Sequence, residues 1–267
     1  MIDNKKLAKF YDKVYLKGEK KHYTKFVIEG SPTSEAEEIL KQLKWTGKKV
    51  LEVGCGTGRF CYLVAKEGAD VLGIDFSAEG IDIAKRTYRL PNLRFKKLDV
   101  ADIDGKYDIV VSIGTLEHMD DPLNTLRLLK KHLNPYGRLI ITSPNWTNVR
   151  GYVLMTLHYL FRAPVTLADL HYLTPIDFTK WAKKINMNLK WKTFDRSWGH
   201  GELMIKDFAR RIPKVLYDAR LPSNHENVNK LLKWLKQNVV PLDNSSAYSG
   251  AIGMYIFSFK KESTKRR

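Results

Sequence analysis

The segment at residues 49–58, KVLEVGCGTG, constrains the fold of this chain more than any other stretch. Its apolar residues precede three glycines at alternate positions, and apolar residues at helical spacing resume from Phe60. The pattern predicts a buried strand that turns sharply into a helix. Glycine suits such a turn because a Cβ would block both the bend and the close approach of a ligand. We therefore expect a ligand-binding turn, since unpaired N–H groups and the positive end of the helix dipole lie beside it.

The chain carries an excess of basic residues, 46 Lys and Arg against 29 Asp and Glu, for a net charge of +17. Such an excess is compatible with nucleic acid, an anionic membrane surface or acidic substrates as partners. The basic residues are dispersed, with local concentrations at 183–192, 210–220 and 260–267. Dispersed charge is better evidence of solubility than of a particular partner. We therefore interpret the basic excess as a lysine-rich soluble surface.

Only two cysteines occur, Cys55 and Cys61, and neither stands at a metal-binding spacing. We expect no metal site and a reduced, cytoplasmic protein. The first residues lack the apolar core of a signal peptide. The longest apolar run, at 151–161, is too short to cross a bilayer, so no membrane span is expected. The sequence carries no signal for an oligomeric state.

Strand-like and helix-like patterns alternate from residue 48 onward, which predicts an α/β fold with a parallel sheet and helices on both faces. Strands are expected at 50–53, 70–75, 93–98, 107–113 and 138–143, with helices at 59–67, 77–86 and 122–133. The rhythm changes after residue 144. The remaining expected elements are a connection at 145–170, a helix to about 186, a strand at 189–194, helical stretches near 202–211 and 228–239, and a last strand at 251–259.

The glycine spacing argues against a dinucleotide site. A dinucleotide fingerprint that begins at Gly54 would need its third glycine at position 59, which is Arg59. Here the third glycine is Gly58, and an acid, Glu52, precedes the first. With this spacing, the segment 52–58, EVGCGTG, resembles motif one of the class I S-adenosylmethionine-dependent methyltransferases.

Three further matches follow in the order found in that family. Asp75, at the end of the second expected strand, resembles the ribose-binding acid; residues 98–100, LDV, resemble the adenine-side motif; and residues 114–122, GTLEHMDDP, resemble the loop after strand four. This loop, with 143–145 and 171–175, is similar to the branch that contains ubiquinone-biosynthesis O-methyltransferases and many small-molecule methyltransferases.

The resemblance, which is strong over 48–145, implies a Rossmann-like sheet of seven strands, with strand seven antiparallel between strands five and six. It also implies S-adenosylmethionine as the methyl donor and S-adenosylhomocysteine as the product. Segment 197–249 departs from the family, in which strands six and seven are usually joined directly. We predict a single methyltransferase domain, 1–267. Its N-terminal helical cap, 1–47, is expected to contain a helix at 4–17 and a second helix that starts from a capping box at 34–37. The segments that follow are a cofactor-binding core (48–145), a lid-like connection (146–170), a last crossover and strand six (171–196), a helical insertion (197–249), a last strand (250–260) and a basic tail (261–267).

The resemblance assigns roles to individual side chains. Asp75 can accept hydrogen bonds from both ribose hydroxyls, whereas Phe76 and Ile113 offer apolar surface to the adenine. Asp99 is predicted to contact the adenine amino group. A helix cap remains the alternative for Asp75, and a turn residue for Asp99. Glu52 is expected to order the turn from beneath, with cofactor contact as the alternative. The predicted cofactor-binding residues are Glu52, Gly54, Cys55, Gly56, Gly58, Asp75, Phe76, Asp99, Val100, Ile113 and Leu116.

Methyl transfer to a hydroxyl is helped by a general base. His118 and His171 are the predicted bases, because a near-neutral imidazole can take the proton and both are expected at the ligand edge of the sheet. The alternatives are that His118 braces its loop and that His171 hydrogen-bonds a carbonyl. His200 is a third candidate.

Residues outside the common core are expected to bind the methyl acceptor. Arg150 and Arg162 flank the apolar run and favour contact with a membrane surface that would collect a lipid-like acceptor. Aromatic side chains here suit an apolar or aromatic acceptor, with core packing as the alternative. These aromatics are Trp146, Tyr152, Tyr159, Phe161 and Tyr172.

These observations lead to a function hypothesis with two rivals. The hypothesis is S-adenosylmethionine-dependent methyl transfer to a small-molecule or lipid-like acceptor, with O-methylation preferred. The net charge keeps an RNA (tRNA or rRNA) methyltransferase as the alternative, although the sequence shows no compact phosphate-binding motif. The second alternative is a cofactor-binding regulatory protein without turnover.

Overall fold

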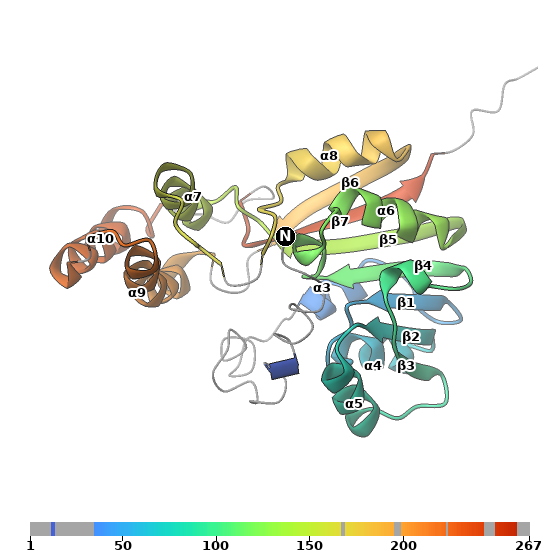
Figure 1. The fold of residues 1–267 in the computed structure, drawn as a ribbon. Helices are drawn as coiled ribbons and strands as arrows, with labels where there is room; N and C mark the ends of the chain where they lie inside the picture. Colours follow the sequence, from blue (N-terminus) through green and yellow to red (C-terminus); the bar gives the residue numbers. More distant parts are fainter. Residues whose placement is uncertain are drawn as a thin grey trace, which may run out of the picture.

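The computed structural model describes residues 12–13, 35–166, 169–194, 199–222, 224–242 and 249–260. The predicted basic tail and most of the helix predicted at 4–17 lie outside these ranges. Within them, the central feature is one seven-stranded sheet with the strand order β3-β2-β1-β4-β5-β7-β6 (Figure 1). The strands are β1 (Lys49–Val53), β2 (Asp70–Asp75), β3 (Leu93–Lys97), β4 (Tyr107–Ile113), β5 (Leu133–Pro144), β6 (Met187–Phe194) and β7 (Ile252–Phe259).

The sheet has the topology that the family resemblance implied. β1 to β5 run parallel, and β7 lies antiparallel between β5 and β6. The carboxyl ends of β1, β2 and β4 therefore meet at one edge, where open α/β sheets bind ligands. The predicted α/β Rossmann-like fold is confirmed.

Helices cover both faces of the sheet, which is why the strands are apolar throughout. Successive strand residues point to opposite faces, so Val50 and Leu51 enter different cores. Val50 packs in the core formed with α3 (Glu35–Leu40), α4 (Arg59–Lys66) and α5 (Ala78–Thr87). Leu51 packs in the core formed with α6 (Pro122–Lys131) and α8 (Pro175–Lys184).

The largest differences from the predicted element boundaries are at the start of β5 and the end of α9 (Gly201–Asp218). β5 was expected to begin at Arg138 after a turn, but it begins at Leu133, and its pairing with β4 is irregular between Tyr107 and Ile109. The helix expected near 202–211 continues to Asp218 through Pro213. The turn-forming residues 134–137 led to the late start predicted for β5, and Pro213 led to the early end predicted for α9. Pairing with β4 and packing of α9 in a helical core override these local signals.

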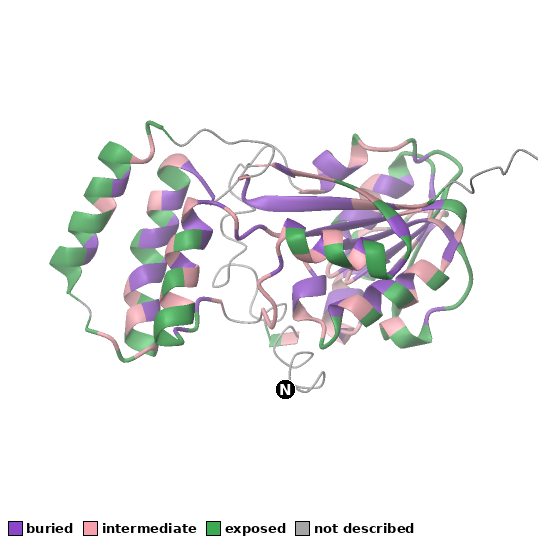
Figure 2. Ribbon diagram, turned by 90° about the horizontal axis from the view of Figure 1, so that it is seen from above, coloured by how far each residue is buried: buried purple, intermediate pink, exposed green. Residues whose placement is uncertain are grey.

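Three helices form a smaller, separate core beyond the carboxyl ends of the strands (Figure 1; Figure 2). They are α7 (Val149–Phe161), α9 (Gly201–Asp218) and α10 (His225–Asn238). Leu154 of α7, Phe208 of α9 and Leu235 of α10 are all buried in this core. The connection after β5 and the insertion before β7 thus fold against each other, although some forty residues of chain separate α7 from α9. None of the described helices is long and apolar enough to span a bilayer.

A buried ionic network joins α7 to α9. The Asp207 carboxylate accepts hydrogen bonds from Arg150 Nε at 2.8 Å and from Arg211 Nε at 3.1 Å. Arg211 Nη1 also donates to the Val165 carbonyl at 3.0 Å, which ties α9 to the connection after α7. Burial opposes ionisation of Asp207, but the guanidinium groups of Arg150 and Arg211 outweigh it and lower the pKa of Asp207.

Replacing Asp207 tests whether this network holds the helical unit together. D207N removes the counter-charge of two buried arginines, so we expect a loss of about 3–5 kcal/mol in the free energy of unfolding at pH 7. Because the pKa of Asp207 is lowered in the fold, its stabilisation is present at neutral pH and is lost as the pH falls through that lowered pKa. Urea unfolding measures the loss.

D218N is the matched control on the same helix. Asp218 pairs with the exposed Lys214 one turn away, and such surface pairs contribute about 0.3–0.5 kcal/mol. Equal losses in D207N and D218N would contradict the account of a buried network.

Candidate active site

The glycine turn between β1 and α4 requires glycine for its conformation and its packing. Gly54, Gly56 and Gly58 have φ angles of +75°, +50° and +83°. A Cβ on Gly54 would lie 2.4 Å from Thr115 Oγ1, and one on Gly58 would lie 2.6 Å from the Phe95 ring. At two of the three positions, glycine is therefore needed for the protein's own packing, in addition to any approach by a ligand.

Asp75, at the end of β2, is bonded to this turn. Its Oδ2 accepts a hydrogen bond from the Gly56 N–H at 2.8 Å, and its Oδ1 accepts one from the Ser77 N–H at 2.8 Å. Burial raises the pKa of Asp75, while bonds from Ser77, Gly56 and Phe76 oppose the rise. The geometry gives one N–H bond to each carboxylate oxygen, from Gly56 and from Ser77, and a carboxylate has about four acceptor positions.

Ser77, rather than Asp75, is the N-cap of α5. Its Oγ accepts from the Gly80 N–H at 3.1 Å and donates to Asp12 Oδ1 at 2.5 Å. The second bond brings a residue of the N-terminal cap to the end of β2. Ser77 thus has the helix-capping role that was the alternative for Asp75. Ribose binding by Asp75 stays a prediction.

Asp99 caps a short 3-10 helix, η2 (Val100–Asp102). Its Oδ1 accepts from the Ala101 N–H at 2.9 Å, and its side chain is exposed. One carboxylate oxygen of Asp99 therefore makes the turn contact that was given as its alternative role. Contact of Asp99 with adenine stays a prediction, and so does contact by the half-buried Val100.

The apolar side chains predicted to contact the cofactor differ in burial. Phe76 and Ile113 are half-buried, whereas Cys55 is buried in the core beneath α4. Leu116 is only 1% exposed and packs in the core formed with α6 and α8. Phe76 and Ile113 retain surface for a ligand in this conformation, and cofactor contact by any of the four stays a prediction.

Glu52 lies beneath the glycine turn. Its Oε2 accepts from the Cys61 N–H at 3.1 Å and from Cys61 Sγ at 2.8 Å, so the carboxyl group joins β1 to α4. Burial is the main cause that raises the pKa of Glu52 to about 8; the Cys61 bonds lower it and the charge of Asp75 raises it. Direct cofactor contact by Glu52 remains a prediction.

This raised pKa makes a testable contribution to pH-dependent stability. Between its ordinary value of 4.5 and about 8, folded Glu52 holds a proton that the unfolded chain releases, so stability falls as the pH rises through this window. We expect E52Q to remove up to about 1.4 kcal/mol per pH unit from that slope, measured by urea unfolding from pH 5 to 8. The exposed variant E67Q is the control, and an E52Q slope equal to that of E67Q would contradict the assignment.

The loop after β4 and the connection before α8 bring both predicted bases together. His118 closes η3 (Leu116–His118), and its Nδ1 lies 3.4 Å from Asp169 Oδ1. His171 Nε2 lies 2.9 Å from the Met119 carbonyl. The Glu117 carbonyl accepts from the Leu170 and His171 N–H groups, at 3.0 and 3.1 Å. His171 thus makes the carbonyl contact foreseen as its alternative, and His118 has an acidic neighbour that the sequence did not indicate.

His200, the third candidate base, lies elsewhere. It occupies the N-cap position of α9, and its Nε2 lies 2.6 Å from the Ser249 carbonyl. This contact joins the two ends of the insertion. A catalytic role for His200 stays a prediction.

Glu117 is a buried acid that sequence reasoning placed only within a motif. Burial raises its pKa well above the ordinary value, and the charges of Asp169 and Glu35 raise it further. Its Oε2, Ser143 Oγ and the Tyr255 hydroxyl are buried without a hydrogen-bond partner among the described residues. The direction of this shift favours the protonated form of Glu117, which precedes His118 in the same short helix.

The predicted aromatic cluster divides into two groups. Trp146 is buried, and its ring meets that of Tyr172 edge-on at 5.0 Å, so these two pack the helical unit. Tyr152, Tyr159 and Phe161 of α7 are exposed. The core-packing alternative therefore holds for Trp146 and Tyr172.

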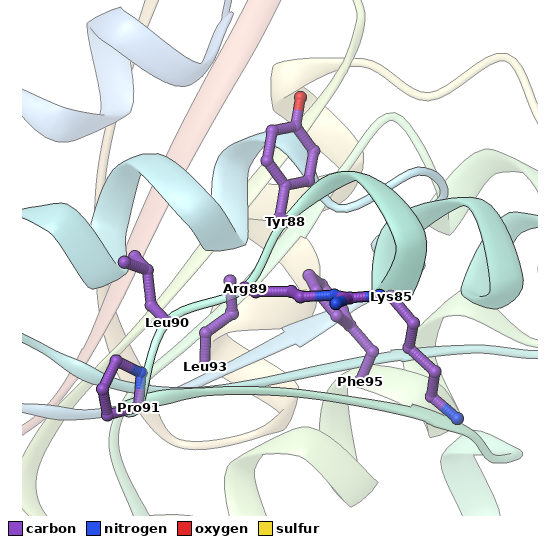
Figure 3. Close-up of a pocket in the computed structure, with 7 residues that line it drawn as sticks. All are labelled: Lys85, Tyr88, Arg89, Leu90, Pro91, Leu93 and Phe95. Atoms are coloured by element: carbon purple, nitrogen blue, oxygen red, sulfur yellow. The ribbon is translucent and has the colours of Figure 1, made fainter.

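A cavity of about 470 Å³ lies away from these residues (Figure 3). It is formed where α5 ends and β3 begins, with Lys85, Arg89 and Leu93 among its lining residues. Phe95, which lines the cavity, packs against Gly58 of the glycine turn. The cavity itself lies at the amino end of β3, and the ligand edge of the sheet is at the carboxyl ends of the strands. No three His, Cys, Asp or Glu side chains within the described ranges are arranged to hold a metal ion.

Comparison with known proteins decides the family. The model of a family described as "Methyltransferase domain" matches residues 30–190, which is more than half of the chain. The chain belongs to this methyltransferase family. The match ends at β6, so the insertion that carries α9 and α10 lies outside it.

Two curated relatives are ubiquinone biosynthesis O-methyltransferases. That of Actinobacillus pleuropneumoniae serotype 7 is 30% identical over 155 residues, 53% of this chain and 66% of the relative. That of Acinetobacter baylyi is 28% identical over 155 residues, 54% and 65% of the two chains. This methyltransferase chain thus matches slightly less than two thirds of the length of these relatives.

Solved methyltransferases share the fold of the chain. Magnesium protoporphyrin IX methyltransferase of Synechocystis PCC 6803, with bound S-adenosylhomocysteine, has a TM-score of 0.64 and 15% identity, covering 97% of this chain and all of that one. An S-adenosylmethionine-dependent methyltransferase of Mesorhizobium loti has a TM-score of 0.54 and 13% identity, covering 86% and 98% of the two chains. At these identities the likeness concerns the fold.

Proposed function

We propose that this protein transfers a methyl group from S-adenosylmethionine to a small-molecule or lipid-like acceptor, with a hydroxyl oxygen as the preferred nucleophile. The observation that carries the proposal is the Asp75 carboxylate bonded to the glycine turn at the carboxyl edge of the sheet. Membership of the methyltransferase family supports the reaction class. The names of the ubiquinone-biosynthesis relatives support an oxygen acceptor on a small molecule.

The residues present fit this donor. The glycine turn and Asp75 are bonded to each other through the Gly56 N–H, and a carboxylate has acceptor capacity for a ribose hydroxyl beside its N–H bonds. Phe76 and Ile113, both half-buried, offer apolar surface for adenine. S-adenosylmethionine supplies an electrophilic methyl group on a cationic sulfur, and the protein must align the acceptor with it and exclude water.

Proton removal is the second task of the protein. When a hydroxyl becomes a methyl ether it loses its proton, and His118 and His171 lie at the ligand edge where an imidazole can accept it. His171 Nε2 contacts the Met119 carbonyl, whereas His118 Nδ1 has a carboxylate, that of Asp169, at 3.4 Å, so we take His118 as the first candidate base.

Changing Asp75 tests the donor site. D75N keeps the size of the side chain but removes the charge, so we expect donor affinity to fall about 10–100-fold, the cost of one or two hydrogen bonds to a charged group. Calorimetric titration with S-adenosylmethionine measures it. The nearby exposed variant D102N is the control and should bind as the wild type does. Wild-type affinity in D75N would remove the ribose assignment.

The acceptor class is tested with methyl-labelled S-adenosylmethionine. The protein is incubated with separated small-molecule, lipid and RNA fractions, and label is expected in the small-molecule or lipid fraction. Label in RNA alone would favour the RNA methyltransferase alternative. Donor binding with no labelled fraction would favour a regulatory protein without turnover.

Exposed apolar residues on α7 support a lipid-like acceptor taken from a membrane surface. Tyr152, Tyr159 and Leu160 are 62%, 74% and 70% exposed, and the exposed Arg162 follows the helix. Such a stripe beside a cation suits the interface of an anionic bilayer. The helical unit that carries it lies beyond the edge where the donor is proposed to bind (Figure 1). The prediction that Arg150 also contacts the membrane is wrong, because Arg150 is buried against Asp207.

Vesicle binding tests this contact. We expect Y159S/L160S to lower the fraction that sediments with anionic phospholipid vesicles several-fold, because it removes apolar area from the stripe. Y136S is the control, since Tyr136 is 88% exposed but lies at the amino-terminal end of β5. No sedimentation of the wild type with anionic vesicles would contradict the contact.

A further inference from the structure

Asp169 is a buried acid beside the proposed base. Its Oδ1 lies 3.4 Å from His118 Nδ1, and the two side chains are 14% and 13% exposed. This distance is at the long end of a hydrogen bond, and such contacts often shorten when a reacting complex forms. Asp169 reaches His118 from the connection between α7 and α8, far along the chain from η3.

The backbone around Asp169 is fixed on both sides. On one side, the Asp169 N–H donates to Thr166 Oγ1 at 3.3 Å. On the other, the Leu170 and His171 N–H groups donate to the Glu117 carbonyl, next to His118. The bonds that hold Asp169 therefore also hold the loop of its partner histidine.

Cations from α7 and from the helical insertion act on Asp169. Burial raises the pKa of Asp169 above its ordinary value, and the charges of His118, Arg150 of α7 and Arg211 of α9 oppose that rise. Asp207 of α9 orients both arginines, and Arg211 binds the Val165 carbonyl just before this segment. The charges held by Asp207 thus act on the acid that faces His118.

We infer that Asp169 is a positioning residue for His118, and that the insertion serves the active site through Asp207 and its two arginines. The inference rests on the proposed function, because it concerns the removal of the acceptor proton. A carboxylate that accepts from Nδ1–H fixes the imidazole in one tautomer, with the lone pair on Nε2 at the opposite side of the ring.

The step balances without a further reactant. The O–H bond of the acceptor and the S–CH₃ bond of the donor break, while an O–CH₃ bond and an N–H bond at His118 Nε2 form. The donor leaves as a neutral thioether, and the proton later passes to water. The Asp169 side chain faces the imidazolium that forms, and as a carboxylate it stabilises that charge.

Kinetics of D169N test this role. With an acceptor identified by labelling, we expect kcat to fall about 100-fold, the range of a lost general base, while donor affinity stays unchanged. D169N should add little to the loss in an H118A background, since the two residues act as a unit. D169E should recover part of kcat. Wild-type kcat in D169N, or additive losses in the double variant, would overturn the inference.

A spectroscopic readout separates this inference from the proposed function. Nitrogen-15 spectra of the histidine rings, assigned with H118Q, should show the Nδ1–H tautomer for neutral His118 in the wild type and a changed tautomer ratio in D169N. An Nε2–H tautomer in the wild type would overturn the inference, even if D169N does not fold. If His118 shows the expected tautomer but the protein transfers no methyl group, the proposed function is contradicted and the contact between Asp169 and His118 is not. D218N, an exposed acid on α9, should match the wild type in both measurements.

Discussion

The hydrogen bonds between Asp75 and the backbone of two turns are the interaction on which the proposed donor site depends. They join Gly56, after β1, to Ser77, after β2. The parallel register of β1 and β2 brings these turns together, because Val53 pairs with Ile74 and the Gly54 N–H bonds to the Ile74 carbonyl. Burying a carboxylate is unfavourable unless N–H groups compensate it, so the acid and the glycine turn need each other.

The ligand edge of this basic protein is lined by acids. The chain has a net charge of +17, yet Asp75 and Asp169 lie beside the neighbours of β1 in the sheet, β2 and β4. These acids, and not the lysine-rich surface, lie near the edge where we propose that the cationic donor binds. The charge of the whole chain is thus a poor guide to the ligand, whereas the charge at the strand ends is informative.

Local patterns in the sequence were sufficient for most of the fold, and they placed the glycine turn and Asp75 at strand ends. The glycine turn and Asp75 stand next to strands with clear apolar runs, and the family resemblance supplied the position of β7. Asp169 could not be found in this way, because its meaning comes from contact with His118 some fifty residues earlier. The joint core of α7 and α9 was missed for the same reason. Each helix has an apolar pattern of its own, and such a pattern does not indicate which other helix it packs against.

The central claim is that the glycine turn and Asp75 hold the methyl donor at the edge that carries His118. A crystal structure of the protein with S-adenosylhomocysteine tests it most directly. We expect a ribose hydroxyl within hydrogen-bond distance of the Asp75 carboxylate and the thioether sulfur directed toward the loop of His118. A ligand bound elsewhere, or one that leaves Asp75 without a ribose contact, would contradict the account.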